Sequence, residues 1–120
     1  MKYRMPVLAI VLIACPAIAH AMDADTFYLK AAALKKKGMA AMMSKDLKPV
    51  MSEMEAAGKS VKAENAKAKA AGKPLYCPPA KTGMSQEQVL AEFARIPAAR
   101  RKTMTTRQAW REILIRRYPC

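Results

Sequence analysis

The side chains that could do chemistry in this chain are few: three cysteines, one histidine and nine carboxylates. His20, the only histidine, lies in a segment that we expect to be removed, so the mature chain cannot build a Ser–His or Cys–His nucleophile. Glu53 and Glu55 are two residues apart on a predicted helix and therefore face different ways. The four glycines are scattered and form no phosphate-binding loop. The sequence predicts a protein that is not an enzyme and holds no metal or cofactor.

The first 21 residues have the pattern of a secretory signal peptide. Lys2 and Arg4 make the start basic, residues 5–19 are apolar, and Ala19-His20-Ala21 is a small-x-small cleavage site. The apolar run is short for a bilayer crossing, which takes about 20 residues, so an uncleaved anchor is the less favoured alternative. We expect cleavage after Ala21, which leaves a domain of residues 22–120 in the periplasm.

Cys15 suggests a second processing route. The sequence Leu12-Ile13-Ala14-Cys15 has the form of a bacterial lipoprotein box, in which the cysteine becomes a lipidated first residue. The apolar run before Cys15 is brief, however, and Pro16 follows the cysteine directly. We therefore favour cleavage after Ala21 and keep lipidation of Cys15 as the alternative.

Either route leaves Cys77 and Cys120 as an even pair in an exported chain. Two free thiols would be unusual in an oxidising compartment, so we predict a disulfide between them. A covalent tie of this kind suits a domain of this size, which buries only a modest share of its surface. Cysteines committed to each other cannot form a zinc site.

Apolar residues recur at helical spacing in the first half of the mature chain. Asp23 and Asp25 precede a first helix, whose inward stripe consists of Phe27, Ala31, Leu34, Gly38 and Met42. We expect Asp46 to cap a second helix, Leu47 to Ala71, which ends at Gly72. Its inward stripe consists of Val50, Met54, Ala57 and Val61. The far half is rich in lysine and alanine and is either a lightly packed helix or a frayed segment.

Two further helices are marked by capping boxes, Ser85 with Gln88 and Thr105 with Gln108. Each helix would be roughly 18 Å long, and a basic turn from Pro97 to Met104 joins them. Such a short connection predicts antiparallel neighbours, which brings the two cysteines together at the open end. The sequence thus predicts an all-α fold, a small bundle of about four helices with a disulfide-closed C-terminal helical hairpin.

Five methionines lie where the first two helices meet: Met39, Met42, Met43, Met51 and Met54. Methionine-rich patches serve either as adaptable binding surfaces or as gap-filling core. We favour the core.

The charge is strongly positive. The formal net charge is +13, and removing residues 1–21 takes away Lys2 and Arg4 and no acidic residue, which leaves +11. The C-terminal hairpin carries a candidate basic face for a partner, made of Arg100, Arg101, Lys102, Arg107 and Arg111. Export argues against nucleic acid, so the acidic partners to expect are phospholipid or polysaccharide head groups and acidic proteins. A merely solubilising surface is an equal alternative.

Three short segments, Tyr76-Cys77-Pro78, Ile96-Pro97 and Tyr118-Pro119-Cys120, resemble those of the Rap/Tai immunity proteins of type VI secretion. The resemblance implies a small helical periplasmic protein, often dimeric, that binds a secreted peptidoglycan-cleaving amidase effector and blocks its active site. It also implies that Cys77 and Cys120 form the structural disulfide of the family. A further Cys-x-Gly-Tyr segment of better-known members is absent here. The alternative function is a cationic envelope-associated protein in peripheral contact with anionic lipid or polysaccharide, without an enzyme target.

Overall fold

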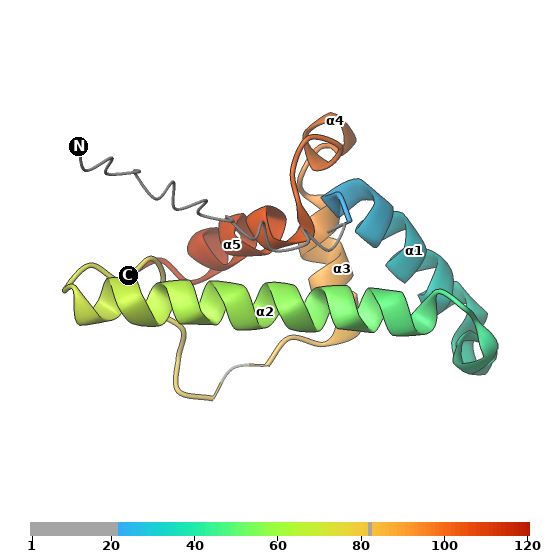
Figure 1. Cartoon of the computed structure of the whole chain (residues 1–120), viewed down its shortest axis with the longest axis horizontal. Helices are drawn as coiled ribbons and strands as arrows, with labels where there is room; N and C mark the ends of the chain where they lie inside the picture. Colours follow the sequence, from blue (N-terminus) through green and yellow to red (C-terminus); the bar gives the residue numbers. More distant parts are fainter. Residues whose placement is uncertain (1–21, 82) are drawn as a thin grey trace, which may run out of the picture.

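The structure is a computed structural model that describes residues 22–81 and 83–120. The predicted signal peptide, its cleavage site and Cys15 lie outside these residues. The described chain folds into α1 (Ala24–Lys37), η1 (Gly38–Met43), α2 (Leu47–Ala70), α3 (Gln86–Ala94), α4 (Ala98–Arg101) and α5 (Thr106–Arg117). It contains no strand, and its one β-bridge joins Asp23 to Thr105 (Figure 1). The predicted all-α bundle is confirmed.

Local polar contacts define both ends of α1. The Asp23 carboxylate accepts a hydrogen bond from the backbone N of Thr26 at 2.7 Å, which holds the pKa of Asp23 below its usual range despite partial burial. The helix ends earlier than the apolar stripe predicts, because Gly38 adopts φ 55° at the C-cap. Only glycine enters this left-handed region without strain. The chain continues as the short 3-10 helix η1, and the last two residues of the predicted inward stripe, Gly38 and Met42, are exposed, so the stripe prediction is wrong for these two positions.

The second helix, α2, is regular from Leu47 to Ala70 and ends at Gly72, whose φ is 81°. The helix prediction for the lysine- and alanine-rich half is therefore confirmed. Asp46 occupies the predicted N-cap position of α2, but its side chain makes no capping hydrogen bond. Its carboxylate instead lies 3.7 Å from Lys30 Nζ, and Ser44 Oγ accepts from the Asp46 backbone N.

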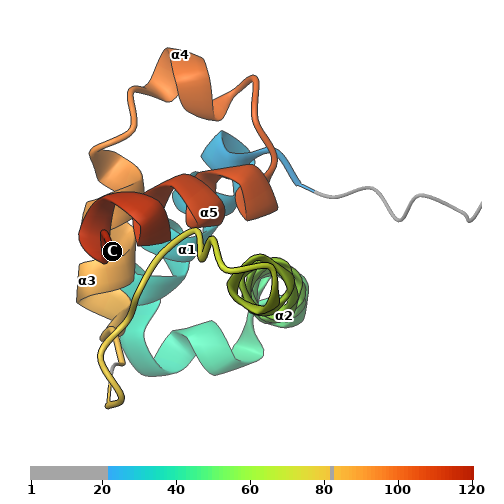
Figure 2. The same ribbon diagram turned by 90° about the vertical axis from the view of Figure 1, so that its left-hand side faces the viewer.

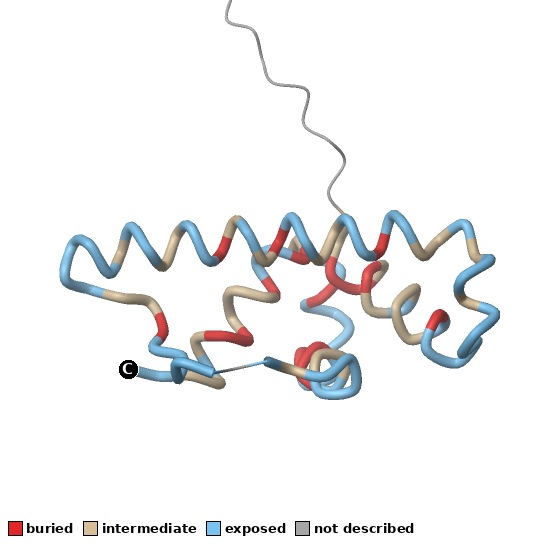
Figure 3. Tube along the Cα trace, turned by 90° about the horizontal axis from the view of Figure 1, so that it is seen from below, coloured by how far each residue is buried: buried red, intermediate tan, exposed pale blue. Residues whose placement is uncertain are grey.

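The core lies where α1, α3 and α5 meet the inner face of α2. Phe93 is fully buried between the rings of Phe27, at 5.0 Å, and Trp110, at 6.3 Å. A second, smaller cluster joins Val61 of α2 to Leu114 of α5 and Tyr76. Figure 3 shows the buried residues of α2 on the side that faces the other helices, with the opposite side exposed. A core this small contributes little to the free energy of folding, so a disulfide can add a large share of the stability.

The predicted covalent bond is present, because Cys77 and Cys120 form a disulfide with an S–S distance of 2.05 Å. Beside it, the Cys77 backbone N donates to the carbonyl of Tyr118 at 2.8 Å. Asn65 holds the approach to Cys77, because its amide oxygen accepts from the backbone N of Leu75 at 2.8 Å and its amide nitrogen donates to the carbonyl of Tyr76 at 3.1 Å. The predicted disulfide is confirmed.

The helices that carry the disulfide are arranged differently from the prediction. In Figures 1 and 2, α3 stands upright in both views while α5 lies across it, so the two helices cross instead of running antiparallel. The physical reason is that α5 finds better partners on the far half of α2. There Leu114 packs against Val61, and two arginines of α5 pair with Glu64. The cysteines meet because residues 71–77 turn back from the end of α2.

The first described residue makes a contact that bears on processing. The backbone N of Met22 donates to Glu53 Oε1 at 3.1 Å. If the leader is removed after Ala21, this nitrogen becomes the charged amino terminus and the hydrogen bond becomes an ion pair. Glu53→Gln should then lower the free energy of unfolding of a chain that starts at Met22 by about 1 kcal/mol.

Urea unfolding of the mature chain measures this loss. Glu55→Gln is the matched control, because Glu55 pairs only with Lys59 on the outside of α2. The same comparison in a chain that still carries the leader should show a smaller loss for Glu53→Gln. Equal losses in the two chains would contradict the ion pair.

Candidate binding surfaces

The arginines of the described residues are all committed to the protein itself. Each of the seven lies within ion-pair distance of a carboxylate: Arg95, Arg100, Arg101, Arg107, Arg111, Arg116 and Arg117. They are concentrated in the C-terminal part, where they connect α3, α4 and α5 to one another and to α1 and α2. Most of the arginines therefore form ion pairs within the protein that hold its helices together.

Arg101 is the most deeply placed of them, with 7% of the residue exposed. Its Nε lies 3.0 Å from the Asp25 carboxylate, and its Nη1 donates to the carbonyls of Phe93, at 3.2 Å, and Ile96, at 2.6 Å. The guanidinium lies 4.3 Å from the centre of the Tyr28 ring. The three hydrogen bonds need the planar fork of donors that arginine has, and the same flat group stacks on the aromatic ring. Arg101 thus joins α1, α3 and α4 and is not open to a partner.

The other four residues of the predicted basic face fall into two groups. Arg107 and Arg111 of α5 reach Glu64 of α2, at 3.1 Å and 2.8 Å. Arg100, on α4, pairs with Glu112 at 2.9 Å but remains more than half exposed. Lys102 is exposed and makes no ion pair with a carboxylate of the described residues. Arg100 and Lys102 are the cations that the turn around α4 presents to solvent.

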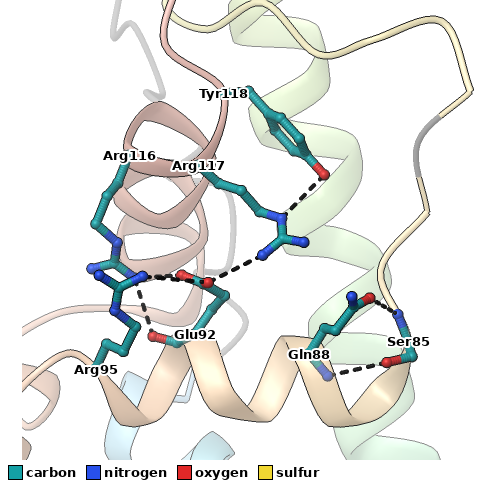
Figure 4. Close-up of polar contacts among 7 residues, drawn as sticks. All are labelled: Ser85, Gln88, Glu92, Arg95, Arg116, Arg117 and Tyr118. Carbon is teal, nitrogen blue, oxygen red and sulfur yellow. Dashed lines mark hydrogen bonds and ion pairs between the residues drawn. The ribbon is translucent and has the colours of Figure 1, made fainter.

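Glu92 was not singled out from the sequence, yet three arginines converge on it (Figure 4). Its carboxylate lies 2.7 Å from Arg116, 3.2 Å from Arg117 and 3.6 Å from Arg95. The hydrogen bond from Arg116 outweighs the effect of burial and, with the nearby positive charges, holds the pKa of Glu92 below its ordinary value of 4.5. The only signal in the sequence was the scarcity of acids beside many arginines, because α3 and α5 contain just three carboxylates, Glu87, Glu92 and Glu112.

This depressed pKa predicts an acid-sensitive contribution to stability. The unfolded chain takes up the proton more readily than the folded chain, so the contribution is present above pH 4.5 and is lost as the pH falls through the lower folded-state pKa. Glu92→Gln should be less stable than the wild type at neutral pH, and the difference should shrink in acid.

Thermal melts across this pH range measure the effect. Part of the acid sensitivity should remain in Glu92→Gln, because the pKa of Asp23 is also depressed. Glu87→Gln is the control, since Glu87 is exposed and pairs only with Lys35. A difference between wild type and Glu92→Gln that stays constant with pH would contradict the role of ionised Glu92.

The surplus positive charge therefore resides on lysines. Thirteen of residues 22–120 are lysines, and only Lys30, Lys35 and Lys59 pair with a carboxylate of the described residues. Four unpaired, exposed lysines surround η1: Lys36, Lys37, Lys45 and Lys48. Four others lie toward the opposite end of α2: Lys62, Lys67, Lys69 and Lys73. The unpaired cations that the surface offers to an external anion are therefore lysines.

The interpretation of the methionines as core is wrong for four of the five. The exposed fractions are 88% for Met39, 71% for Met42, 90% for Met43 and 62% for Met51, and only Met54 packs against the core. We call these four exposed residues the methionine tip. They remain uncovered because η1 carries the chain around the corner between α1 and α2, at the margin of the bundle (Figure 1). No element of the described chain packs over this corner.

An apolar groove opens beside the methionine tip, with a cavity volume of about 540 Å³. Side chains from α1, η1, α2 and α3 line it, and Met42 and Met51 belong to both the groove and the tip. The deeper wall includes Phe27, Leu34, Val50, Met54 and Leu90. A volume of this size lies in the usual range for ligand pockets, about 300 to 1,000 Å³.

Other kinds of site are not found in the described residues. No group of three or more His, Cys, Asp or Glu side chains could hold a metal ion there. Within the same residues, no helix combines the length and apolar character needed to cross a bilayer. Comparisons with protein-family models, with curated proteins and with solved structures find no match to this chain.

Proposed function

We propose that the chain is an exported, non-catalytic binding protein of the immunity type, which neutralises a secreted peptidoglycan-degrading enzyme in the periplasm. The observation that carries the proposal is the turn around α4, residues 97–104. In Figures 1 and 2 this turn projects from one side of the bundle, above α3 and α5. An inhibitor that enters the cleft of an enzyme needs a projection of this kind.

The projecting turn is held from several sides. Arg101 fixes its base through Asp25 and the carbonyls that end α3. On the returning side, the backbone N of Ala24 donates to the carbonyl of Met104 at 2.8 Å, and Thr105 begins α5 with a capping box. A turn already held in one conformation loses little entropy on binding, which favours affinity.

The exposed side chains of the turn also suit entry into the cleft of an enzyme. Its outer residues are Pro97, Ala98 and Ala99, which are small and exposed, followed by the cations Arg100 and Lys102. Small side chains allow the backbone to approach closely, and the two cations would complement an acidic rim. The Cys77–Cys120 disulfide, which the resemblance to the Rap/Tai proteins implies, is present and stabilises the scaffold behind the turn.

The test uses the tagged mature protein, a candidate peptidoglycan amidase from the same cell envelope and an amidase assay. We expect a stable complex and loss of amidase activity. Lys102→Glu should weaken binding by about tenfold through lost charge complementarity. Lys62→Glu is the matched control, because Lys62 is also exposed and unpaired but lies on α2, away from the turn.

Two results would contradict the proposal. One is the absence of any amidase that binds the mature protein and of protection in cells that express such an enzyme in the periplasm. The other is equal weakening by Lys102→Glu and Lys62→Glu, which would mean that net charge, and not the α4 turn, determines binding.

A further inference from the structure

The methionine tip and the lysines around it form a surface that neither the fold nor the α4 turn explains. Four large apolar side chains are exposed at one corner of the molecule, and two of them, Met39 and Met43, are 88% and 90% exposed. Exposed apolar residues that are grouped and bordered by charge mark a binding site more often than residues scattered singly. The exposed charges around this group that make no ion pair among the described residues are all positive.

We propose that the methionine tip docks the protein on the surface of an anionic phospholipid bilayer, with one acyl chain entering the apolar groove. The proposal is independent of the amidase partner, because it concerns a different end of the molecule. In Figure 1 the tip lies at the C-terminal end of α1, whereas α4 lies near its N-terminal end. A chain docked through the tip would leave the α4 turn facing away from the lipid.

Charge complementarity selects anionic lipid as the occupant. Lys36, Lys37, Lys45 and Lys48 are exposed and unpaired among the described residues. The nearby carboxylates do not offset them, since Asp46 is engaged by Lys30 and Glu87 by Lys35. Clusters of four or more basic residues beside an apolar face are typical of binding to anionic lipid surfaces.

The apolar part fits a shallow, interfacial mode of binding. Three residues of the methionine tip lie on the short 3-10 helix η1, Gly38–Met43, and the fourth, Met51, lies in the first turns of α2. Flexible, unbranched methionine side chains can adapt to the disordered boundary between head groups and acyl chains. The groove behind them shares Met42 and Met51 with the tip and has an aliphatic and aromatic wall. An acyl chain leaving the bilayer beside the tip would find a continuous apolar path.

Vesicle co-sedimentation of the mature protein tests the docking. Binding is expected to vesicles of phosphatidylcholine mixed with phosphatidylglycerol, and not to phosphatidylcholine alone, and to decline as salt is added. Met39→Gln/Met43→Gln should reduce binding by about tenfold. Both side chains are almost fully exposed, so the thermal melt of this variant should match that of the wild type.

Two matched lysine variants separate the tip from the overall charge. Changing Lys36, Lys37, Lys45 and Lys48 to Gln should weaken binding by roughly several hundred-fold, since each lysine near an anionic surface contributes about fivefold. Changing Lys62, Lys67, Lys69 and Lys73 to Gln removes the same net charge at the other end of α2 and should leave most of the binding intact. Equal losses in the two variants would overturn the proposal.

The groove is tested with a single-chain anionic lipid, lysophosphatidylglycerol, below its micelle concentration. Calorimetry should show saturable binding to the mature protein, no binding of inorganic phosphate, and weakened lipid binding in Ala31→Leu. Ala31 lines the groove but lies outside the methionine tip. No uptake of the lipid by the wild type would overturn the acyl-chain assignment.

A second copy of the chain is the rival occupant. Sedimentation velocity across a concentration series would reveal it. A dimer that Met39→Gln/Met43→Gln abolishes would overturn the lipid proposal in favour of self-association. A monomer that binds anionic vesicles would support it.

Discussion

Serine in place of Cys77 or Cys120 should lower the free energy of unfolding of the mature protein by about 4 kcal/mol. The two cysteines are 43 residues apart in sequence, so the bond removes a large amount of conformational freedom from the unfolded chain. For a domain of about 100 residues, this loss corresponds to a fall in melting temperature of roughly 20 °C. The bond also fixes the end of α5 to the segment that follows α2, where Cys77 and Tyr118 are already hydrogen-bonded.

Thermal melts of the wild type, each single variant and the double serine variant measure this effect. The three variants should be equally destabilised, because each lacks the same bond. Wild-type protein melted in the presence of a reductant should behave like the variants. Unchanged melting temperatures would contradict a stabilising role for the disulfide.

Replacing Arg101 with methionine should destabilise the protein by about 3 to 5 kcal/mol, the usual loss when one partner of a buried ion pair is removed. The substitution leaves the buried Asp25 carboxylate without its cation and the carbonyls of Phe93 and Ile96 without their donor. Arg101→Lys should restore only part of the loss, because one ammonium cannot reach the carboxylate and both carbonyls in the geometry of the fork. Urea unfolding measures each loss.

The control for Arg101 is Arg100→Met on the same short helix. Arg100 is more than half exposed and pairs with Glu112 alone, so its removal should cost less than about 1 kcal/mol. The double variant Asp25→Leu/Arg101→Met should recover part of the stability lost in Arg101→Met, since no unpaired charge then remains buried. Equal effects of Arg100→Met and Arg101→Met would contradict the central role of Arg101. If the α4 turn binds the partner, Arg101→Met should also weaken inhibition, because the turn loses its support.

Interactions close in sequence were predictable. The capping boxes at Ser85 and Thr105 form as their spacing predicts, and the apolar stripe of Val50, Ala57 and Val61 faces the core. The disulfide followed from the cysteine count and the predicted export signal. These features depend on neighbours within about one helical turn or on a pairing with no alternative, so no knowledge of the tertiary fold was needed.

The candidate binding surface was less predictable. From the sequence, the five cations from Arg100 to Arg111 formed one basic face, yet Arg101 is buried against Asp25, which is 76 residues away in sequence. Arg107 and Arg111 reach Glu64, 43 and 47 residues away. Helical periodicity shows which residues share a face of one helix. It contains no information on which carboxylate a neighbouring helix brings to that face.

By itself, the sequence determined that this protein is helical, strongly basic and tied by one disulfide, because composition, spacing and local capping express those properties directly. Only the tertiary structure decided which charges and which apolar residues remain free. The nonlocal packing of α5 on α2 and of Arg101 on α1 uses the arginines internally. The corner at η1 leaves four methionines exposed among unpaired lysines, because no other helix of residues 22–81 and 83–120 packs there.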